Sequence, residues 1–157
     1  MNINFVQIKK NIFFLFYLQL WRLVNSFFFL NFIIGGSIYR IFILRVFGAK
    51  IGANCVIKPN VVIYNPLKIK LGNNVWIGEY TNLYSLDYII IENNVVVSQY
   101  AFLCTGSHDI KNNFKTITGP ILIKKNTWIC AKSIILKNVV ISENKIIEAG
   151  SLIKKNI

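Results

Sequence analysis

Acidic residues are scarce in this chain, and none occurs before Glu79. The 157 residues include 18 basic and six acidic side chains, which gives a formal net charge of +12. A basic stretch beside apolar sequence predicts an anionic partner, such as lipid headgroups or a phosphorylated ligand. Nucleic acid is the least favoured partner, because no recognition-helix, zinc-finger or RNA-binding signature accompanies the charge.

Histidine and cysteine are also rare. His108 is the only histidine, and the three cysteines, at 55, 104 and 130, show no C-x-x-C spacing. We therefore expect no metal site, no disulfide scaffold, and a reducing cytoplasmic location. Charged residues make up 15% of the chain and hydrophobic residues 54%, a composition that excludes intrinsic disorder and suits one domain.

Long apolar runs are confined to the first fifty residues, and Arg22 interrupts them. The charge-free runs cover 11–21 and 23–39, and both are shorter than the roughly 20 apolar residues that a membrane span needs. Gln19, Arg22 and Asn25 recur at helical spacing, which predicts a helix within 12–26 that has one narrow polar stripe. The Gly35-Gly36 pair ends this stretch, and a second helix is expected from Ser37 to Arg45.

Two interpretations of the segment 1–47 remain open. In the first, its helices cap one end of the domain. In the second, they lie on the inner face of the membrane as a peripheral contact, with Arg22, Arg40 and Arg45 near the headgroups. No small-residue cleavage site of a secretory signal follows the Lys9-Lys10 start.

A six-residue period governs the sequence from Ile51 onward. Each of its fifteen aligned positions is Ile, Leu or Val. Two short insertions and one insertion of fourteen residues, at 109–122, leave this register intact. Asn or Gly occupies the fourth place of ten hexads, as a chain that turns a corner every six residues requires. The aliphatic positions are 51, 57, 63, 71, 77, 83, 91, 97, 103, 123, 129, 135, 141, 147 and 153.

Three hexads make one coil of 18 residues, and stacked coils make a parallel β-helix with a continuous aliphatic core. Coils are expected to begin at Ile51, Leu71, Ile91, Ile123 and Ile141. A β-sandwich does not explain a column that keeps its register through insertions. We therefore predict a mainly β protein, with an apolar, basic helical segment at 1–50 and a β-helix domain at 51–157.

Several strings of the sequence resemble the hexapeptide-repeat acyltransferases. They include "IGANCVIKPNVVI", "LGNNVWIGEYTNL" and "IIEAGSLIKK". The strings "SQYAFLCTGSHD" and "GPILIKKNTWI" are similar to the colanic-acid and capsule O-acetyltransferase branch. The resemblance implies a left-handed β-helix, a homotrimer with its active sites between subunits, and acetyl transfer from acetyl-CoA to a hydroxyl of a surface-polysaccharide or saccharide precursor.

The resemblance also implies that His108, at the lip of the insertion, is the general base. An imidazole exchanges a proton near neutral pH, and a sugar hydroxyl needs such help to become a nucleophile. Asp109 is a candidate to orient the ring. A backbone carbonyl is an equal candidate, because adjacent side chains of an extended chain point to opposite faces. Thr105, Gly106 and Ser107 are candidate donors to the oxyanion.

The acetyl-CoA groove of the family lies along the later coils. Matching the motifs puts Ala131, Ala149 and Gly150 beside the coenzyme, where small residues let backbone amides approach it. Lys154 would meet the nucleotide phosphates. Asp87 lies near the position where related galactoside enzymes hold the acceptor.

The chain departs from the family pattern at two glycines, which are replaced by Asn138 and Ser142, and the usual tail is absent after Ile157. These departures favour an alternative function, a non-catalytic β-helix scaffold that trimerises or binds the membrane. The "TGSHD" string favours the enzyme. A carbonic anhydrase on this fold would need three histidines and is excluded.

Overall fold

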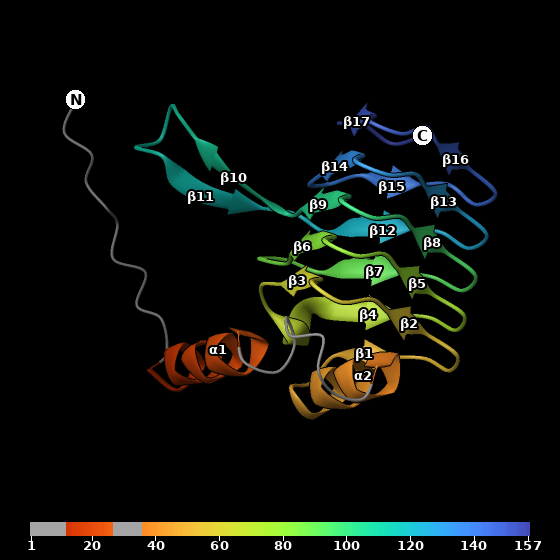
Figure 1. Cartoon of the computed structure of the whole chain (residues 1–157). Helices are drawn as coiled ribbons and strands as arrows, with labels where there is room; N and C mark the ends of the chain where they lie inside the picture. Colours follow the sequence, from red (N-terminus) through yellow and green to blue (C-terminus); the bar gives the residue numbers. More distant parts are fainter. Residues whose placement is uncertain (1–11, 27–35) are drawn as a thin grey trace.

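Residues 50–157 of the computed structural model wind into about five stacked coils, and two helices lie at the end of the stack where the first coil begins (Figure 1). The structure describes residues 12–26 and 36–157. Each coil contributes one strand to each of three parallel sheets, so every strand pairs with its counterpart in the next coil.

The strands of the three sheets are short, mostly two or three residues. The first sheet holds β1 (Lys50–Ile51), β4 (Ile69–Leu71), β7 (Ile89–Ile91), β12 (Ile121–Ile123) and β15 (Val140–Ile141). The second sheet holds β2 (Val56–Ile57), β5 (Trp76–Ile77), β8 (Val96–Val97), β13 (Trp128–Ile129) and β16 (Ile146–Ile147). The third sheet holds β3 (Val62–Ile63), β6 (Asn82–Tyr84), β9 (Phe102–Cys104), β14 (Ile134–Leu136) and β17 (Leu152–Ile153).

The aliphatic column predicted from the hexads forms the core. Leu71 pairs with Ile51 on one side and Ile91 on the other, and the expected coil starts are in register throughout the first sheet. Of the fifteen column residues, all are buried except Ile51 and Ile153, which lie in the first and last rungs and are partly exposed. Side chains of successive coils therefore stack on one another as predicted.

The corners of the coils use left-handed backbone, as the Asn and Gly positions predict. One corner has asparagine in all five coils, with φ between 54° and 60°. Their side chains form a ladder in which each Nδ2 donates to the next Oδ1, through Asn54, Asn74, Asn94, Asn126 and Asn144. Tyr80, Tyr100 and Lys132 also adopt positive φ at fourth hexad positions, so the coil imposes the turn on less suited residues.

The helices α1 (Ile12–Val24) and α2 (Gly36–Val46) cap the first coil. Trp21 is buried in the same cluster as the aliphatic column, and its Nε1 donates to the Ile63 carbonyl at 2.8 Å. Leu44 of α2 is fully buried beside it. Both predicted helices are confirmed, and so is the capping interpretation for these two helices. The rest of the segment 1–47, at 1–11 and 27–35, lies outside the described residues.

Arg40 corrects one part of the membrane interpretation. Its side chain is 4% exposed, and its Nη1 donates to the Ile57 carbonyl at 3.4 Å. Because it lies on the face of α2 that packs on the coil, Arg40 does not lie near headgroups. Within the described residues, no helix is both long and apolar enough to cross a bilayer.

Candidate active site

A β-hairpin leaves the stack between β9 and β12 and projects away from it (Figure 1). Its strands are β10 (Gly106–Asp109) and β11 (Lys115–Thr118), which pair in antiparallel fashion. Gly106 already pairs with Thr118, so the insertion begins three residues before the predicted position 109. His108 therefore lies on the hairpin itself and faces Thr116 across it.

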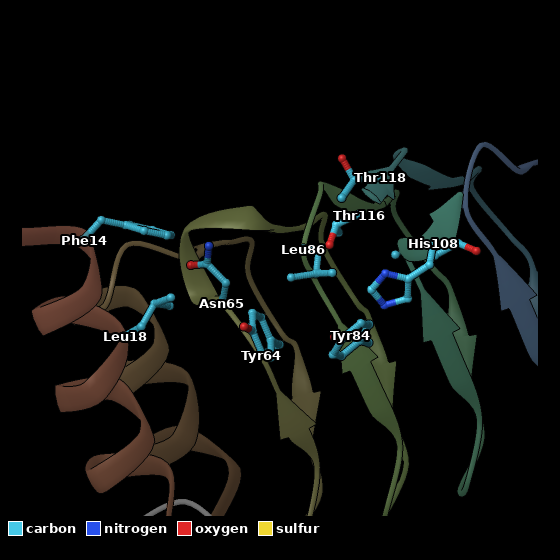
Figure 2. Close-up of a pocket in the computed structure, with 11 residues that line it drawn as sticks. Phe14, Leu18, Tyr64, Asn65, Tyr84, Leu86, His108, Thr116 and Thr118 are labelled. Atoms are coloured by element: carbon cyan, nitrogen blue, oxygen red, sulfur yellow. The ribbon is translucent and has the colours of Figure 1, made fainter. Parts of the chain in front are cut away.

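A pocket of about 520 Å³ lies between α1 and the hairpin. Its floor is the edge of the third sheet, and Figure 2 shows His108 on one side and α1 on the other. Its lining combines aromatic, aliphatic and hydroxyl side chains, a mixture typical of small-molecule sites. The lining residues are Phe14, Leu18, Tyr64, Asn65, Tyr84, Leu86, Gly106, Ser107, His108, Thr116 and Thr118.

The His108 ring is oriented by a backbone carbonyl. Its Nδ1 lies 2.9 Å from the carbonyl oxygen of Phe114, in the turn of the hairpin. A carbonyl only accepts hydrogen bonds, so Nδ1 carries the proton of the neutral imidazole and Nε2 keeps its lone pair. His108 can therefore accept a proton at Nε2.

Asp109 bonds within the turn. Its carboxylate accepts hydrogen bonds from the Asn112 side chain at 2.6 Å and from the Lys111 backbone N–H at 3.0 Å. These two bonds, the Asn112 bond foremost, lower the pKa of Asp109 below its usual value. Of the two orienting groups left open by the sequence, the structure has the backbone carbonyl bonded to the ring.

The three oxyanion candidates have different surroundings. The Thr105 hydroxyl donates to the Tyr84 carbonyl at 2.7 Å and accepts from the Asp87 backbone N–H at 2.9 Å. Thr105 is buried, and its hydroxyl already makes these two hydrogen bonds within the β-helix. Ser107 is exposed and is a lining residue, but it pairs with Ile117, so its side chain lies on the face of the hairpin opposite to His108 and Thr116. Gly106 contributes close packing, since a Cβ there would lie 2.5 Å from Leu86 Cδ1.

Asp87 lies in the connection between β6 and β7, next to the pocket in sequence. Its Oδ1 accepts a hydrogen bond from the Tyr88 backbone N–H at 2.7 Å. The adjacent residue, Leu86, lines the pocket, and Asp87 is not among the lining residues.

Three of the four residues matched to the coenzyme groove lie at the other edge of the third sheet, whereas Lys154 follows β17 at the edge from which the hairpin leaves. Ala131 and Gly150 stack in the corner between the second and third sheets, where the Gly150 N–H donates to the Ala131 carbonyl at 2.9 Å. Ala149, Gly150 and Lys154 are exposed, and a Cβ on Gly150 would have nothing within 4 Å. Crossing the sheet to the hairpin takes about five extended residues, or about 16 Å. One chain does not bring His108 and the corner of Ala131, Ala149 and Gly150 together.

The sequence analysis missed the tyrosines of the pocket floor. Tyr64 and Tyr84 directly follow the column residues Ile63 and Leu83, and their ring centroids are 5.1 Å apart in an edge-on arrangement. Two aromatic residues at equivalent repeat positions beside the insertion were a usable signal. Phe14 and Leu18 carried none, because only tertiary packing brings α1 beside the hairpin.

Metal ligands do not gather in the described part of the chain. No group of three or more His, Cys, Asp or Glu residues there could hold an ion. The three cysteines are unpaired.

Comparisons with known proteins agree with this architecture. The chain is 41% identical over 120 residues to the putative colanic acid biosynthesis acetyltransferase WcaF of Escherichia coli, covering 76% of this chain and 66% of that protein. A hexapeptide-repeat acetyltransferase structure from Vibrio cholerae matches with a TM-score of 0.83 and 19% identity, over 95% of this chain and 85% of that chain. A galactoside acetyltransferase in complex with coenzyme A also matches with a TM-score of 0.83, at 20% identity over 96% and 76%.

At these identities the two solved structures establish the fold alone, which is the hexapeptide-repeat β-helix. No protein-family model matches the chain. The sequence match to WcaF carries the assignment further, although the match spans slightly less than two-thirds of that protein. The chain belongs to the hexapeptide-repeat acyltransferase family. Within that family, its sequence is similar to a putative colanic acid acetyltransferase.

Proposed function

We propose that the protein is an O-acetyltransferase that moves acetyl from acetyl-CoA to a hydroxyl of a saccharide precursor of a surface polysaccharide. The observation that carries this proposal is the hydrogen bond from His108 Nδ1 to the Phe114 carbonyl, which leaves Nε2 as a base at the pocket. The names of the relatives, which include a colanic acid acetyltransferase and a galactoside acetyltransferase bound to coenzyme A, support the substrate classes.

His108 performs the proton transfers of this reaction. Its Nε2 accepts the proton of the acceptor hydroxyl while the hydroxyl oxygen forms a bond to the thioester carbonyl carbon. The carbon–sulfur bond then breaks, and the imidazolium returns the proton to the departing sulfur. The backbone N–H of Gly106, which lines the pocket, is the proposed donor to the oxygen that becomes negative between these steps.

The pocket lining suits a saccharide acceptor. Sugar rings have apolar faces that pack on aromatic rings, here Tyr64 and Tyr84, and hydroxyls that need polar partners. Asn65, Thr116 and Thr118 supply such partners around the same pocket. Asp109 is proposed to act as a positioning residue for the turn, and Asp87 as an acceptor contact at the pocket's edge.

We propose that Ala131, Ala149, Gly150 and Lys154 bind acetyl-CoA, and that a homotrimer completes the site. The corner that Ala131, Ala149 and Gly150 occupy has small residues and an unfilled space at Gly150, which fits close approach by the coenzyme. Because this corner and His108 lie at opposite edges of one sheet, a second copy must bring a coenzyme to the hairpin. We propose a cytoplasmic location for the protein.

A thioester-cleavage assay with candidate glycans tests the catalytic proposal. His108→Ala is expected to lower kcat by about 10²- to 10⁴-fold, with acetyl-CoA affinity unchanged within about twofold. The thermal midpoint should match the wild type, because His108 is exposed on the hairpin. Equal rates in both proteins would remove His108 from the mechanism. Failure of acetyl-CoA to bind the wild type would favour the non-catalytic scaffold.

Subunit mixing tests the shared site. His108→Ala removes the base, and Ala149→Trp fills the proposed coenzyme corner, so each variant should be inactive alone. Random mixing of the two into trimers should restore about one quarter of the wild-type rate. Absence of restored activity in mixed trimers, or a monomer by light scattering, would contradict a site built from two copies.

A further inference from the structure

The side of α1 that faces away from the coil is apolar. Ile12, Phe16, Leu20 and Leu23 follow one another at spacings of four, four and three residues, which places them on one helix face. They are 75%, 70%, 44% and 58% exposed. The opposite face of α1 holds Leu18 and Trp21, which are buried.

The helix α2 repeats this arrangement. Ile38, Phe42 and Val46 are spaced by four residues and are 83%, 64% and 66% exposed, while Arg40, Ile43 and Leu44 pack on the coil. We call the seven exposed side chains of α1 and α2 the outer stripes. A soluble surface rarely keeps such aligned apolar side chains free, so the outer stripes indicate a contact.

The charge around the outer stripes is of one sign. Arg22, Arg45, Lys50, Lys68 and Lys70 belong to the helices and the strands next to them, and the first acidic residue of the sequence is Glu79. Glu79 is already paired with Lys58 at 3.3 Å. Among the described residues, none of the five cations forms an ion pair with a carboxylate. Lys68 and Lys70 lie over the Tyr88 ring, and Arg45 donates to the Ile51 and Gly52 carbonyls, so their positive charges are not neutralised.

We propose that the outer stripes dock the protein on an anionic lipid bilayer, with Arg45, Lys50, Lys68 and Lys70 attracted to the headgroups. Arg22 is the exception, because it follows Leu18 by one turn and lies over the Tyr64 ring on the pocket side of α1. The apolar side chains supply insertion into the headgroup boundary, and the cations supply attraction to anionic lipid. A second copy of this chain is a poorer occupant. Two such ends placed together would bring like charges into contact with no acidic partner. This proposal does not depend on the catalytic one.

The helix α1 then has lipid on one side and the candidate active site on the other. Phe14 and Leu18 line the pocket, while Ile12, Phe16 and Leu23 point in the opposite direction (Figure 2 shows the inner pair). Docking would therefore hold the acceptor pocket one helix thickness from the bilayer.

Vesicle flotation of the full chain tests the proposal. The probes are vesicles of phosphatidylcholine alone and vesicles with about 30% phosphatidylglycerol. The wild type is expected to bind the anionic vesicles at least tenfold more tightly, and 0.5 M salt should reverse most of that difference. Wild-type protein that stays unbound to anionic vesicles at low salt would overturn the proposal.

Matched isoleucines supply the control. Ile12→Glu/Ile38→Glu changes the outer stripes and is expected to weaken binding by at least tenfold. Ile146→Glu/Ile157→Glu makes the same two chemical changes at positions 68% and 41% exposed near the other end of the stack and should leave binding within about twofold. An equal loss in both variants would show that only net charge matters. A smaller oligomer in Ile12→Glu/Ile38→Glu alone, by light scattering, would assign the stripes to contact between copies. Either result would overturn the proposal. Phe42→Ser offers a second variant without added charge.

Discussion

His108 and Phe114 are joined across the hairpin turn, with the ring Nδ1 at 2.9 Å from the backbone carbonyl oxygen. The group that orients the base is therefore part of the backbone and not a side chain. Asn113 and Phe114 hold left-handed backbone, with φ of 50° and 55°, so the position of this carbonyl depends on an unusual turn. What holds the turn therefore controls the base.

Asp109→Ala is expected to lower kcat by about three- to tenfold, with KM for both substrates nearly unchanged. The carboxylate bonds to Lys111 N and Asn112 Nδ2, and losing these bonds loosens the turn that presents the Phe114 carbonyl. A residue bonded directly to the ring would cost about 10⁴-fold, as in a catalytic triad. Steady-state kinetics distinguish the two roles, and Asn112→Ala should reproduce the smaller loss.

Gly106→Ala is expected to raise KM for the acceptor by about tenfold and to leave KM for acetyl-CoA unchanged. The added Cβ would lie 2.5 Å from Leu86 Cδ1 and 3.2 Å from Tyr84 Cε1, so the Leu86 side chain must move in the pocket. Gly106→Ala/Leu86→Ala makes room for the methyl group. If the double variant is no better at binding acceptor than Gly106→Ala, steric displacement of Leu86 is the wrong explanation.

Asn94→Ala is expected to lower the free energy of unfolding by about 2 kcal/mol, measured by urea denaturation. Its side chain donates to Asn126 and accepts from Asn74, and its φ is 58°. Loss of exposed hydrogen bonds and the backbone strain of alanine contribute about equally. Asn94→Gly relieves the strain alone and should lose about half as much. Equal losses would mean that the ladder, and not the backbone conformation, carries the stability.

The stability of the α1 cap is expected to fall between pH 10 and 12. Burial raises the pKa of Tyr17 to about 12, while an unfolded tyrosine ionises near 10. Folding favours the neutral phenol, so this contribution is fully present below pH 10 and is lost as the pH rises through the folded pKa. Because Tyr17 is only about half-buried, the loss should be about 1 kcal/mol. Denaturation of Tyr17→Phe should lack this component, whereas Tyr100→Phe, at an exposed position, should keep it.

The coil could be predicted residue by residue because its constraint is local and repeated. In the second sheet, Ile77, Val97 and Ile129 each pair with an aliphatic residue one coil above and one coil below, and Ile57 and Ile147 end the row. The corners were predicted where Asn or Gly stands, but Tyr80 and Lys132 were not, since stacking there overrides residue preference. Gly106 satisfied the corner pattern and instead starts the hairpin, because it pairs with Thr118, which lies inside the predicted insertion 109–122.

The site was only partly predictable. His108 could be singled out from its motif, but the orienting carbonyl of Phe114 has no sequence signal, since every residue has a carbonyl. The wall formed by Phe14 and Leu18 depends on where α1 docks, which Trp21 fixes through its bond to the Ile63 carbonyl. A repeat pattern predicts contacts between neighbouring coils, but it does not predict contacts between segments outside the repeat, such as α1 and the hairpin.

That bond has a thermodynamic consequence for the pocket. Trp21 ties α1 to Ile63, and the next residue, Tyr64, is part of the pocket floor. One helix thus joins two binding events, one on each of its sides. If lipid contact shifts α1 and changes acceptor affinity by some factor, acceptor binding must change lipid affinity by the same factor. Through that reciprocity, a saccharide in the pocket would regulate how long the enzyme stays on the membrane.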